Sequence, residues 1–297
     1  MVRPFDRALY PFSPHYFDRG EGLRMHFLDE GNGPPVLMLH GNPSWSFYYR
    51  NLVLALRGTH RCIVPDHIGM GLSDKPGDGS YEYLLAQRIT DLEALVASLD
   101  LHEPLTLVVH DWGGMIGMGW AIRHPEQVDR LVILNTAAFP LPAGKRLPRL
   151  LKLARTPLGA LLVRGFNAFA RGAARIGCAR HGMSAPISAA YRAPYDSWAN
   201  RIATLRFVQD IPLHLADRSY ALVHHVAENI GIFNATPAFI VWGGKDFVFD
   251  HEFLAQWRER LPSAKLRYLA DAGHYVLEDA ADEVIPLIAE FVRSSHP

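Results

Sequence analysis

The residue that says most about chemistry is an aspartate placed where a buried strand is expected to turn into a helix. Asp111 comes two residues after the apolar run Leu105–Val109, and Gly113 and Gly114 follow it closely. A side chain at such a sharp turn is exposed, and small neighbours are needed there because the backbones crowd; Val109 is larger than the usual glycine. Serine is typical of ester hydrolases at this position, whereas a carboxylate can attack carbon and become esterified. Asp111 is therefore a candidate nucleophile, with simple capping of the next helix as the alternative.

Two residues further along the chain are candidates for the acid and the base that would assist Asp111. His274 follows the last apolar run, and Asp246 follows a Gly-Gly turn after the preceding run. Nucleophile, acid and base in this chain order form a known kind of catalytic triad. Each residue alone has an ordinary alternative, since a lone histidine is usually structural and an aspartate suits a turn. Asp250 is a second candidate for the acid, but it is expected to begin the next helix.

Asn42 and Trp112 are candidates for stabilising negative charge beside Asp111. Asn42 follows His40 and Gly41 at the end of an apolar run, and the glycine lets the backbone approach the nucleophile closely. The backbone amides of Asn42 and Trp112 would form an anion hole, and both side chains carry further N–H donors. The alternative is that Asn42 caps a turn and Trp112 packs in the core.

Short apolar runs that alternate with helical patterns indicate how these residues are positioned. The runs are Val36–Leu39, Cys62–Asp66, Leu105–Val109, Leu131–Leu134, Ala238–Trp242 and Leu266–Leu269. Their length suits strands that are buried on both faces of a parallel sheet. Helices are expected over Tyr81–Leu99, Gly113–Arg123, Glu252–Leu261 and Asp282–Val292. The alternation predicts a mostly parallel, doubly wound α/β sheet, in which reactive residues gather beyond the carboxyl ends of the strands.

The alternation stops after Thr136, and a different kind of segment follows. Between Ala137 and Glu228 the pattern shows helix-like pieces without a convincing strand, at Leu147–Ala154, Ala160–Arg175 and Ser197–Phe207. We expect this segment to be a helical cap inserted over the ends of the strands. The predicted organisation is thus a core formed by residues 1–136 and 229–297, with a cap formed by residues 137–228.

Composition is ordinary for a globular protein, but charge is unevenly distributed. The chain has 297 residues, of which 49% are hydrophobic, and its 30 basic residues balance its 30 acidic ones. Acidic residues are absent from Arg130 to Arg192, a stretch that holds many lysines and arginines. This basic block can attract a membrane surface, an acidic protein or an anionic ligand, or it can simply be a solvated face. We expect no nucleic-acid partner.

The remaining sequence features argue for a cytoplasmic protein without a cofactor. Cys62 and Cys178 are the only cysteines, and no spacing of residues suggests a metal site or a disulfide framework. The N-terminal stretch Met1–Tyr10 lacks the apolar segment of a signal peptide, and no run is long enough for a membrane-spanning helix.

Taken together, these motifs resemble the haloalkane dehalogenase group of α/β-hydrolases over nearly the whole chain. The segments that carry the resemblance are His40–Trp45, Val109–Gly114, Trp242–Asp246 and Ala272–His274. The resemblance implies an α/β-hydrolase fold, with Asp111 as nucleophile, His274 as base, Asp246 as its orienting acid, and Asn42 and Trp112 as halide ligands. Related epoxide hydrolases protonate their substrate with tyrosines of the cap, and the sequence offers Tyr191, Tyr195 and Tyr220.

A narrower resemblance favours one branch of that group, the β-lactone decarboxylases of bacterial olefin biosynthesis. It is carried by Val64–Gly69, Leu134–Phe139, Leu162–Phe169 and Ser197–Arg201, several of which lie in the predicted cap. It implies conversion of long-chain dialkyl β-lactones to cis-alkenes and carbon dioxide, and a complex with other enzymes of that pathway, including a β-lactone synthetase. Dehalogenation, epoxide hydrolysis and a non-enzymatic ligand receptor are the alternatives.

The position of nucleophilic attack and the residues that line the substrate channel stay open in the sequence. Asp111 would attack the lactone either at the ring carbon or at the carbonyl, and the role of His274 differs between the two. The cap is also expected to hold a hydrophobic substrate. Candidates for lining a channel for two alkyl chains, or for simply packing the cap, are Leu158, Leu161, Leu162, Val163, Phe166 and Phe169.

Overall fold

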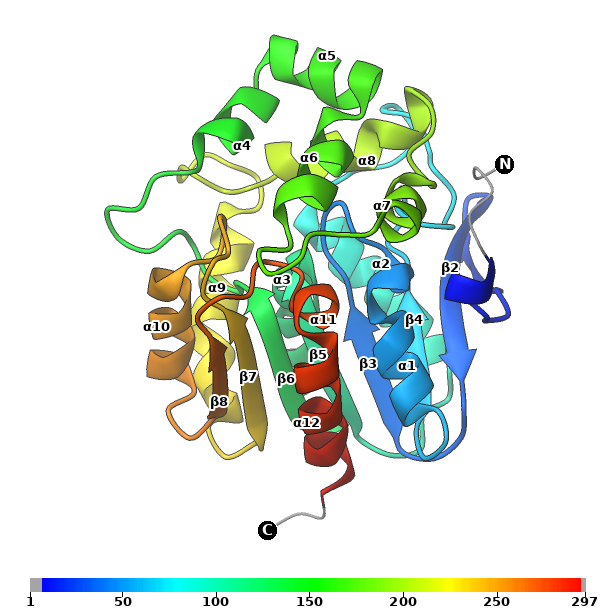
Figure 1. Ribbon diagram of the computed structural model, residues 1–297, viewed down its shortest axis with the longest axis vertical. Helices are drawn as coiled ribbons and strands as arrows, with labels where there is room; N and C mark the ends of the chain where they lie inside the picture. The colour runs from blue at the N-terminus through cyan, green and yellow to red at the C-terminus, as the bar shows by residue number, and fades with distance from the viewer. Residues whose placement is uncertain (1–6, 295–297) are drawn as a thin grey trace.

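An eight-stranded sheet forms the centre of the computed structural model, which describes residues 7–294 (Figure 1). The strands are β1 (His15–Gly20), β2 (Leu23–Glu30), β3 (Pro35–Leu39), β4 (Arg61–Pro65), β5 (Leu105–Asp111), β6 (Val128–Thr136), β7 (Ala238–Gly243) and β8 (Lys265–Leu269). Their order in the sheet is β1-β2-β4-β3-β5-β6-β7-β8, and all neighbours are parallel except β1–β2 and β2–β4. Residues 1–6, part of the stretch assessed for a signal peptide, lie outside the described residues.

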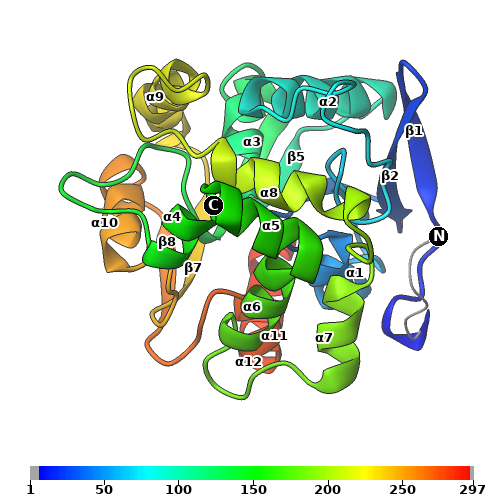
Figure 2. The same ribbon diagram turned by 90° about the horizontal axis from the view of Figure 1, so that it is seen from above.

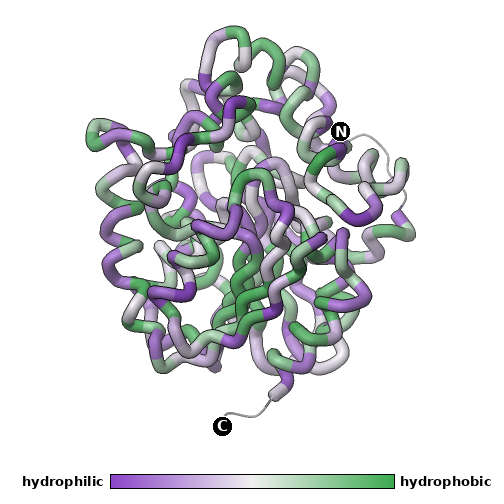
Figure 3. Tube along the Cα trace, turned by 60° about the vertical axis from the view of Figure 1, so that its left-hand side comes forward, coloured by the Kyte–Doolittle hydropathy of each residue, from purple (hydrophilic) through white to green (hydrophobic). Residues whose placement is uncertain are grey.

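The apolar runs predicted as strands form β3 to β8. Strands β3 to β7 are buried almost throughout, because helices cover both faces of the sheet. The predicted burial on both faces is wrong for β8, an edge strand in which four of the five residues are exposed. Along β3, Leu37 and Leu39 belong to one hydrophobic core while Val36 and Met38 belong to the other. Figure 3 shows the hydrophobic residues concentrated in these central strands. The predicted mostly parallel, doubly wound α/β sheet is thus confirmed. The antiparallel strands β1 and β2 were not predicted. Strand β1 is largely exposed and mixes polar with aromatic residues. Strand β2 is buried at its centre, but His26 interrupts its apolar run and charged residues flank it.

Helices lie on the two faces of the sheet and above its carboxyl edge (Figures 1 and 2). They are α1 (Arg50–Leu56), α2 (Leu85–Ser98), α3 (Trp112–Ala121), α4 (Arg149–Ala154), α5 (Pro157–Phe166), α6 (Ala168–Ile176), α7 (Ala185–Arg192), α8 (Ile202–Gln209), α9 (Tyr220–Asn229), α10 (His251–Arg260), α11 (Val276–Asp279) and α12 (Ala281–Arg293). Helices α2, α3, α9 and α10 contribute to one core, and α1, α11 and α12 to the other. None of the helices within residues 7–294 has the length and apolar character to span a membrane.

Helices α4 to α8 cover the ends of the strands, and the range 137–228 assigned to a cap contains them. The same range also includes nearly all of α9, which packs against α3 beside the sheet. One long piece predicted at Ala160–Arg175 is in fact split between α5 and α6. The break falls at Asn167, whose φ of 54° is left-handed, a conformation that asparagine tolerates better than most residues.

Candidate active site

Asp111 sits at the sharp turn between β5 and α3. Its backbone has φ 50° and ψ −125°, outside the regions that L-residues usually occupy, so the turn holds it in a strained conformation. The hydroxyl of Thr136 at the end of β6 donates a hydrogen bond to the Asp111 carbonyl and supports the turn. The Asp111 side chain makes no capping hydrogen bond to α3 beyond its contact with the N–H of Trp112, the first residue of the helix, and its carboxylate also accepts the N–H of Asn42. Its geometry therefore does not fit the alternative in which it only caps the helix.

Two glycines, Gly41 and Gly113, leave the space that the carboxylate of Asp111 and the turn around it occupy. A Cβ at Gly41 would overlap that carboxylate, and a Cβ at Gly113 would overlap the carbonyl of Leu39. The loop after β3 and the start of α3 therefore approach the nucleophile more closely than any other residue type allows.

His274 and Asp246 lie next to Asp111, beyond the ends of β8 and β7. The Nε2 atom of His274 is 3.8 Å from Oδ2 of Asp111, and its Nδ1 is 2.7 Å from Oδ2 of Asp246. The second oxygen of Asp246 accepts backbone N–H groups of Val248 and Phe249, at 2.7 and 3.1 Å. Asp246 thus fixes the imidazole with Nε2 facing the nucleophile. Asp250, the alternative acid, caps α10 and takes no part in this chain.

Burial and neighbouring charges set the protonation of this trio. Burial raises the pKa of Asp111, and the nearby His274 together with the N–H groups of Asn42 and Trp112 opposes the rise. Burial would lower the pKa of His274, but the carboxylates of Asp246 and Asp111 together outweigh it, so the pKa is raised above 6.5. The imidazole is therefore poised to carry a positive charge beside the nucleophile.

Asn42 and Trp112 both contribute to the floor of the site, in ways the sequence did not specify. The backbone N–H of Asn42 donates to Oδ1 of Asp111 at 2.5 Å, so it holds the nucleophile itself. The side-chain amide of Asn42 donates to the carbonyl of Thr204 in α8, at 2.9 Å. The indole of Trp112 packs against Phe207, which also belongs to α8, with ring centroids 5.2 Å apart. Both residues therefore join the nucleophile's surroundings to the cap.

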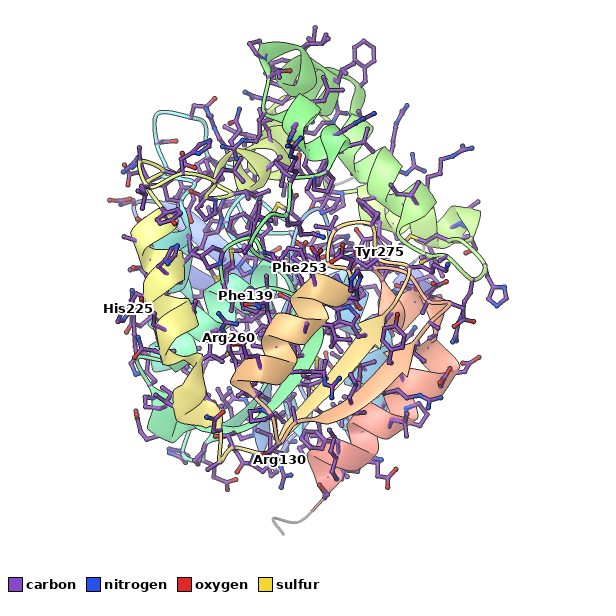
Figure 4. The ribbon with its side chains drawn as sticks, turned by 90° about the vertical axis from the view of Figure 1, so that its left-hand side faces the viewer. Arg130, Phe139, His225, Phe253, Arg260 and Tyr275 are labelled. Atoms are coloured by element: carbon purple, nitrogen blue, oxygen red, sulfur yellow. The ribbon has the colours of Figure 1, made fainter. Side chains whose placement is uncertain are left out.

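An apolar cavity of about 270 Å³ lies between this floor and the cap. Asp111, His274, Asn42 and Trp112 supply its polar end. Its walls are formed by apolar side chains from α3, α4, α5, α6, α10 and neighbouring loops, among them Met115, Leu147, Leu151, Leu162, Val163, Phe169, Ala173, Ile211 and Phe249. Phe139, Phe253 and Tyr275, which also line it, lie at the level where the core meets the cap (Figure 4). Such a cavity suits a largely hydrocarbon substrate with one reactive group.

The residues expected to line an alkyl channel divide into two sets. Leu162, Val163 and Phe169 line the cavity. The other three face solvent instead, with exposed fractions of 59% for Leu158, 48% for Leu161 and 63% for Phe166. That part of the expectation is wrong, because α5 turns only one of its faces towards the cavity.

Further residues of the site were not identified from the sequence. Phe249 stacks on the imidazole of His274, with ring centroids 5.9 Å apart. Lys145 lines the cavity and forms ion pairs with Asp250 and Glu252 of α10, more than a hundred residues away in the chain. Neither contact leaves a local signal, since Phe249 reaches His274 between the loops after β7 and β8, and Lys145 reaches α10 from the loop before α4.

Comparison with known proteins agrees with this architecture. The family model described as alpha/beta hydrolase fold matches residues 34–281, and the chain belongs to that family. Haloalkane dehalogenase DbeA from Bradyrhizobium elkani superposes with a TM-score of 0.83 at 26% identity, covering 95% of this chain and 97% of its own. DatA from Agrobacterium tumefaciens superposes with a TM-score of 0.85 at 22% identity, over 96% and 98% of the two chains, which shows the shared fold.

Curated relatives narrow the family. A cis-3-alkyl-4-alkyloxetan-2-one decarboxylase from Shewanella oneidensis is 59% identical over 97% of this chain and 91% of its own length. A protein of the same name from Xanthomonas campestris is 50% identical over 96% and 97% of the two chains. Haloalkane dehalogenase 2 of Mycobacterium tuberculosis is 32% identical over 96% of both. The chain therefore groups with these decarboxylases, inside the dehalogenase-like α/β-hydrolases.

Proposed function

We propose that this protein converts long-chain cis-3,4-dialkyl β-lactones to cis-alkenes and carbon dioxide, with Asp111 as nucleophile. The observation that carries the proposal is a carboxylate held in a strained turn at the floor of an apolar cavity. The names and high identity of the two decarboxylase relatives support the choice of substrate.

In the first step, an oxygen of Asp111 attacks the ring carbon that bears the lactone oxygen. The new C–O bond to Asp111 forms as the ring C–O bond breaks, with inversion, and the lactone oxygen becomes part of a free carboxylate. The N–H of Asn42, 2.5 Å from Oδ1, orients the attacking carboxylate. Opening of the strained four-membered ring drives this step.

In the second step, the bond between the substrate carbon and its carboxylate breaks and carbon dioxide leaves. Its electron pair forms the alkene and expels Asp111, so the nucleophile is regenerated without water. Anti elimination after inversion turns a cis lactone into a cis alkene. The positively charged His274, 3.8 Å from Asp111, stabilises the carboxylate that forms again. This route requires no proton transfer, which is why we prefer it to attack at the carbonyl, where an alkoxide and an anhydride would result.

Hydrolytic dehalogenation is the second candidate, because the 32% identical dehalogenases share the fold and a similar site could displace halide. His274 would then act as a base on water. Epoxide hydrolysis has less support from the described residues. Tyr191 donates to Glu278 and Tyr195 to the carbonyl of Ser44, and neither lines the cavity. Tyr220 packs against His224 within α9, also outside the cavity.

The proposal is tested by offering the purified enzyme a cis-dialkyl β-lactone and, separately, a long-chain bromoalkane. We expect cis-alkene from the first and little bromide from the second. Rapid bromide release without alkene formation would contradict the proposal. Turnover in ¹⁸O-labelled water then distinguishes the chemistry, since the route above places no label in Asp111, whereas hydrolysis of an alkyl ester does.

We also place this enzyme in the cytoplasm. Cys62 and Cys178 are both free and buried, as suits a reducing compartment. Fractionation of the native cells would test this placement, and a secreted pool would contradict it.

A further inference from the structure

The outward surfaces of α4, α5 and α6, together with Trp198, form what we call the cap face. Figure 1 shows α5 at the summit of the molecule, and Figure 2 shows the three helices side by side from above. The cap face exposes large apolar side chains, which are Leu150, Leu153, Leu158, Leu161, Phe166, Ile176 and Trp198. Leu150 is 65% exposed and Trp198 49%. Apolar residues gathered in this way usually mark a site of association.

Cations accompany the apolar side chains on the cap face and next to it. The exposed ones are Arg146, Arg149, Lys152, Arg171 and Arg175. Within residues 7–294, no acidic side chain forms an ion pair with any of these five. Arg164, by contrast, is paired with Asp78 at the edge of the cap. The charge of the cap face is therefore available to an anionic surface.

The substrate cavity reaches this same surface. Leu150 and Leu153 of α4 and Ile176 of α6 line the cavity and are also exposed on the cap face. An alkyl chain that enters between α4 and α6 thus stays in contact with apolar side chains from outside to inside.

We propose that the cap face docks on an anionic phospholipid membrane, from which the hydrophobic substrate enters the cavity. Apolar side chains that penetrate the acyl region, with cations beside them at the level of the phosphates, are the pattern of interfacial helices. Leu158, Leu161 and Phe166 project from α5, and Arg171 and Arg175 lie one turn apart on α6. The delivery of substrate rests on the proposed function, but the docking itself does not.

Vesicle co-sedimentation without substrate tests the docking directly. We expect the protein to bind phosphatidylcholine vesicles that contain phosphatidylglycerol about tenfold more tightly than pure phosphatidylcholine, with release at high salt. If the protein bound neither kind of vesicle, the docking proposal would be overturned. The decarboxylation assay would be unaffected by that result.

Two double variants separate the contributions of charge and apolar contact. Arg171→Glu with Arg175→Glu should weaken binding to anionic vesicles about tenfold or more, and Leu161→Gln with Phe166→Gln should do the same at unchanged charge. The matched control is Arg258→Glu with Lys265→Glu, which makes the same charge change on α10 and β8, away from the cap. Melting temperatures verify that each variant is folded.

The same variants test whether the cap face binds a protein partner instead of a membrane. An equal loss of vesicle binding in the control would overturn the proposal, since it would show nonspecific attraction. So would cap-face variants that keep full vesicle binding but lose co-purification with a β-lactone synthetase.

Discussion

The loops of the core and the helices of the cap meet at one cavity, but they are built differently. On the core side, hydrogen bonds fix each reactive group, as between His274 and Asp246 or Asn42 and Asp111. On the cap side, the wall consists of apolar side chains such as Leu162 and Phe169, which form no hydrogen bonds of their own. Directional bonds define one geometry, whereas apolar packing tolerates changes of shape. We infer that the core determines which bond is broken and that the cap determines which hydrocarbon is accepted.

The largest effect should follow removal of the nucleophile on the core side. We expect Asp111→Asn to lower kcat by about 10⁴-fold or more, because no other group replaces the attacking carboxylate. The fold should become more stable at neutral pH. Burial raises the pKa of Asp111, so the folded state disfavours the ionised form at every pH above the unfolded pKa, and the amide removes that penalty. Alkene release and the melting temperature measure the two effects. Substantial remaining turnover would exclude covalent catalysis.

Asp246→Asn should have the next largest effect, about 10³-fold on kcat, because His274 would no longer be held as a positive charge beside Asp111. The imidazole of His274 would lose both its orientation and the charge that raises its pKa, so burial would lower that pKa. The pH profile of the variant should therefore lose its activity at a lower pH than the wild type. The matched control is Asp250→Asn. Asp250 pairs with Lys145 and does not contact His274. A similar loss in that control would contradict a specific role for Asp246.

Gly41→Ala tests the close approach of the β3 loop. The added methyl group overlaps the Asp111 carboxylate, so the nucleophile must shift, and we expect kcat to fall about 10²-fold. Gly58→Ala adds a methyl group in open space and serves as the control. Unchanged kinetics in Gly41→Ala would show that the loop moves freely.

The wild-type pH profile should be bell-shaped. Only ionised Asp111 attacks, so kcat/KM should fall about tenfold per unit as the pH drops below its raised pKa, on the alkaline side of 3.8. Loss of the positive charge on His274, above pH 6.5, should lower the rate again. Steady-state rates with a β-lactone across the stability range provide the measurement. Activity that instead rises as His274 loses its proton would favour a general base and thus hydrolysis.

The smallest effect is expected on the cap side. Leu162→Ala enlarges the cavity, and we expect a few-fold change in KM and in the preferred chain length with little change in kcat. Leu54→Ala on the exposed side of α1 is the control, since Leu54 is 41% exposed and far from the cavity. A large loss of kcat in Leu162→Ala would contradict the inference that the cap determines only which hydrocarbon is accepted.

The sequence predicted the core much better than the cap, for a physical reason. A strand buried on both faces is an apolar run between turns, and the reactive residues at its end are local in sequence. The order of Asp111, Asp246 and His274 could thus be read directly, and the structure brings the three together. Even the bulky Val109 has a compensation that the sequence hides, because Gly117 on α3 leaves space for it.

The orientation of the cap helices was not readable in this way. Leu161 and Leu162 are neighbours of the same type, yet one faces solvent and the other the cavity. The rotation of a helix that is apolar on both sides is set by what it packs on, and that information lies in distant residues. The edge strand β1 was missed for a related reason, since it buries too little to leave a pattern.

The bond from the Asn42 amide to the carbonyl of Thr204 has a consequence for protein engineering. A residue three positions beyond the end of β3 takes its orientation from the inserted helices, so the two parts are not independent modules. Grafting the helices of a relative onto this scaffold would exchange hydrocarbon preference only if the graft keeps a main-chain acceptor at the place of Thr204. A chimaera designed on apolar shape alone would leave a buried amide without its acceptor and would disturb the reaction it was meant to redirect.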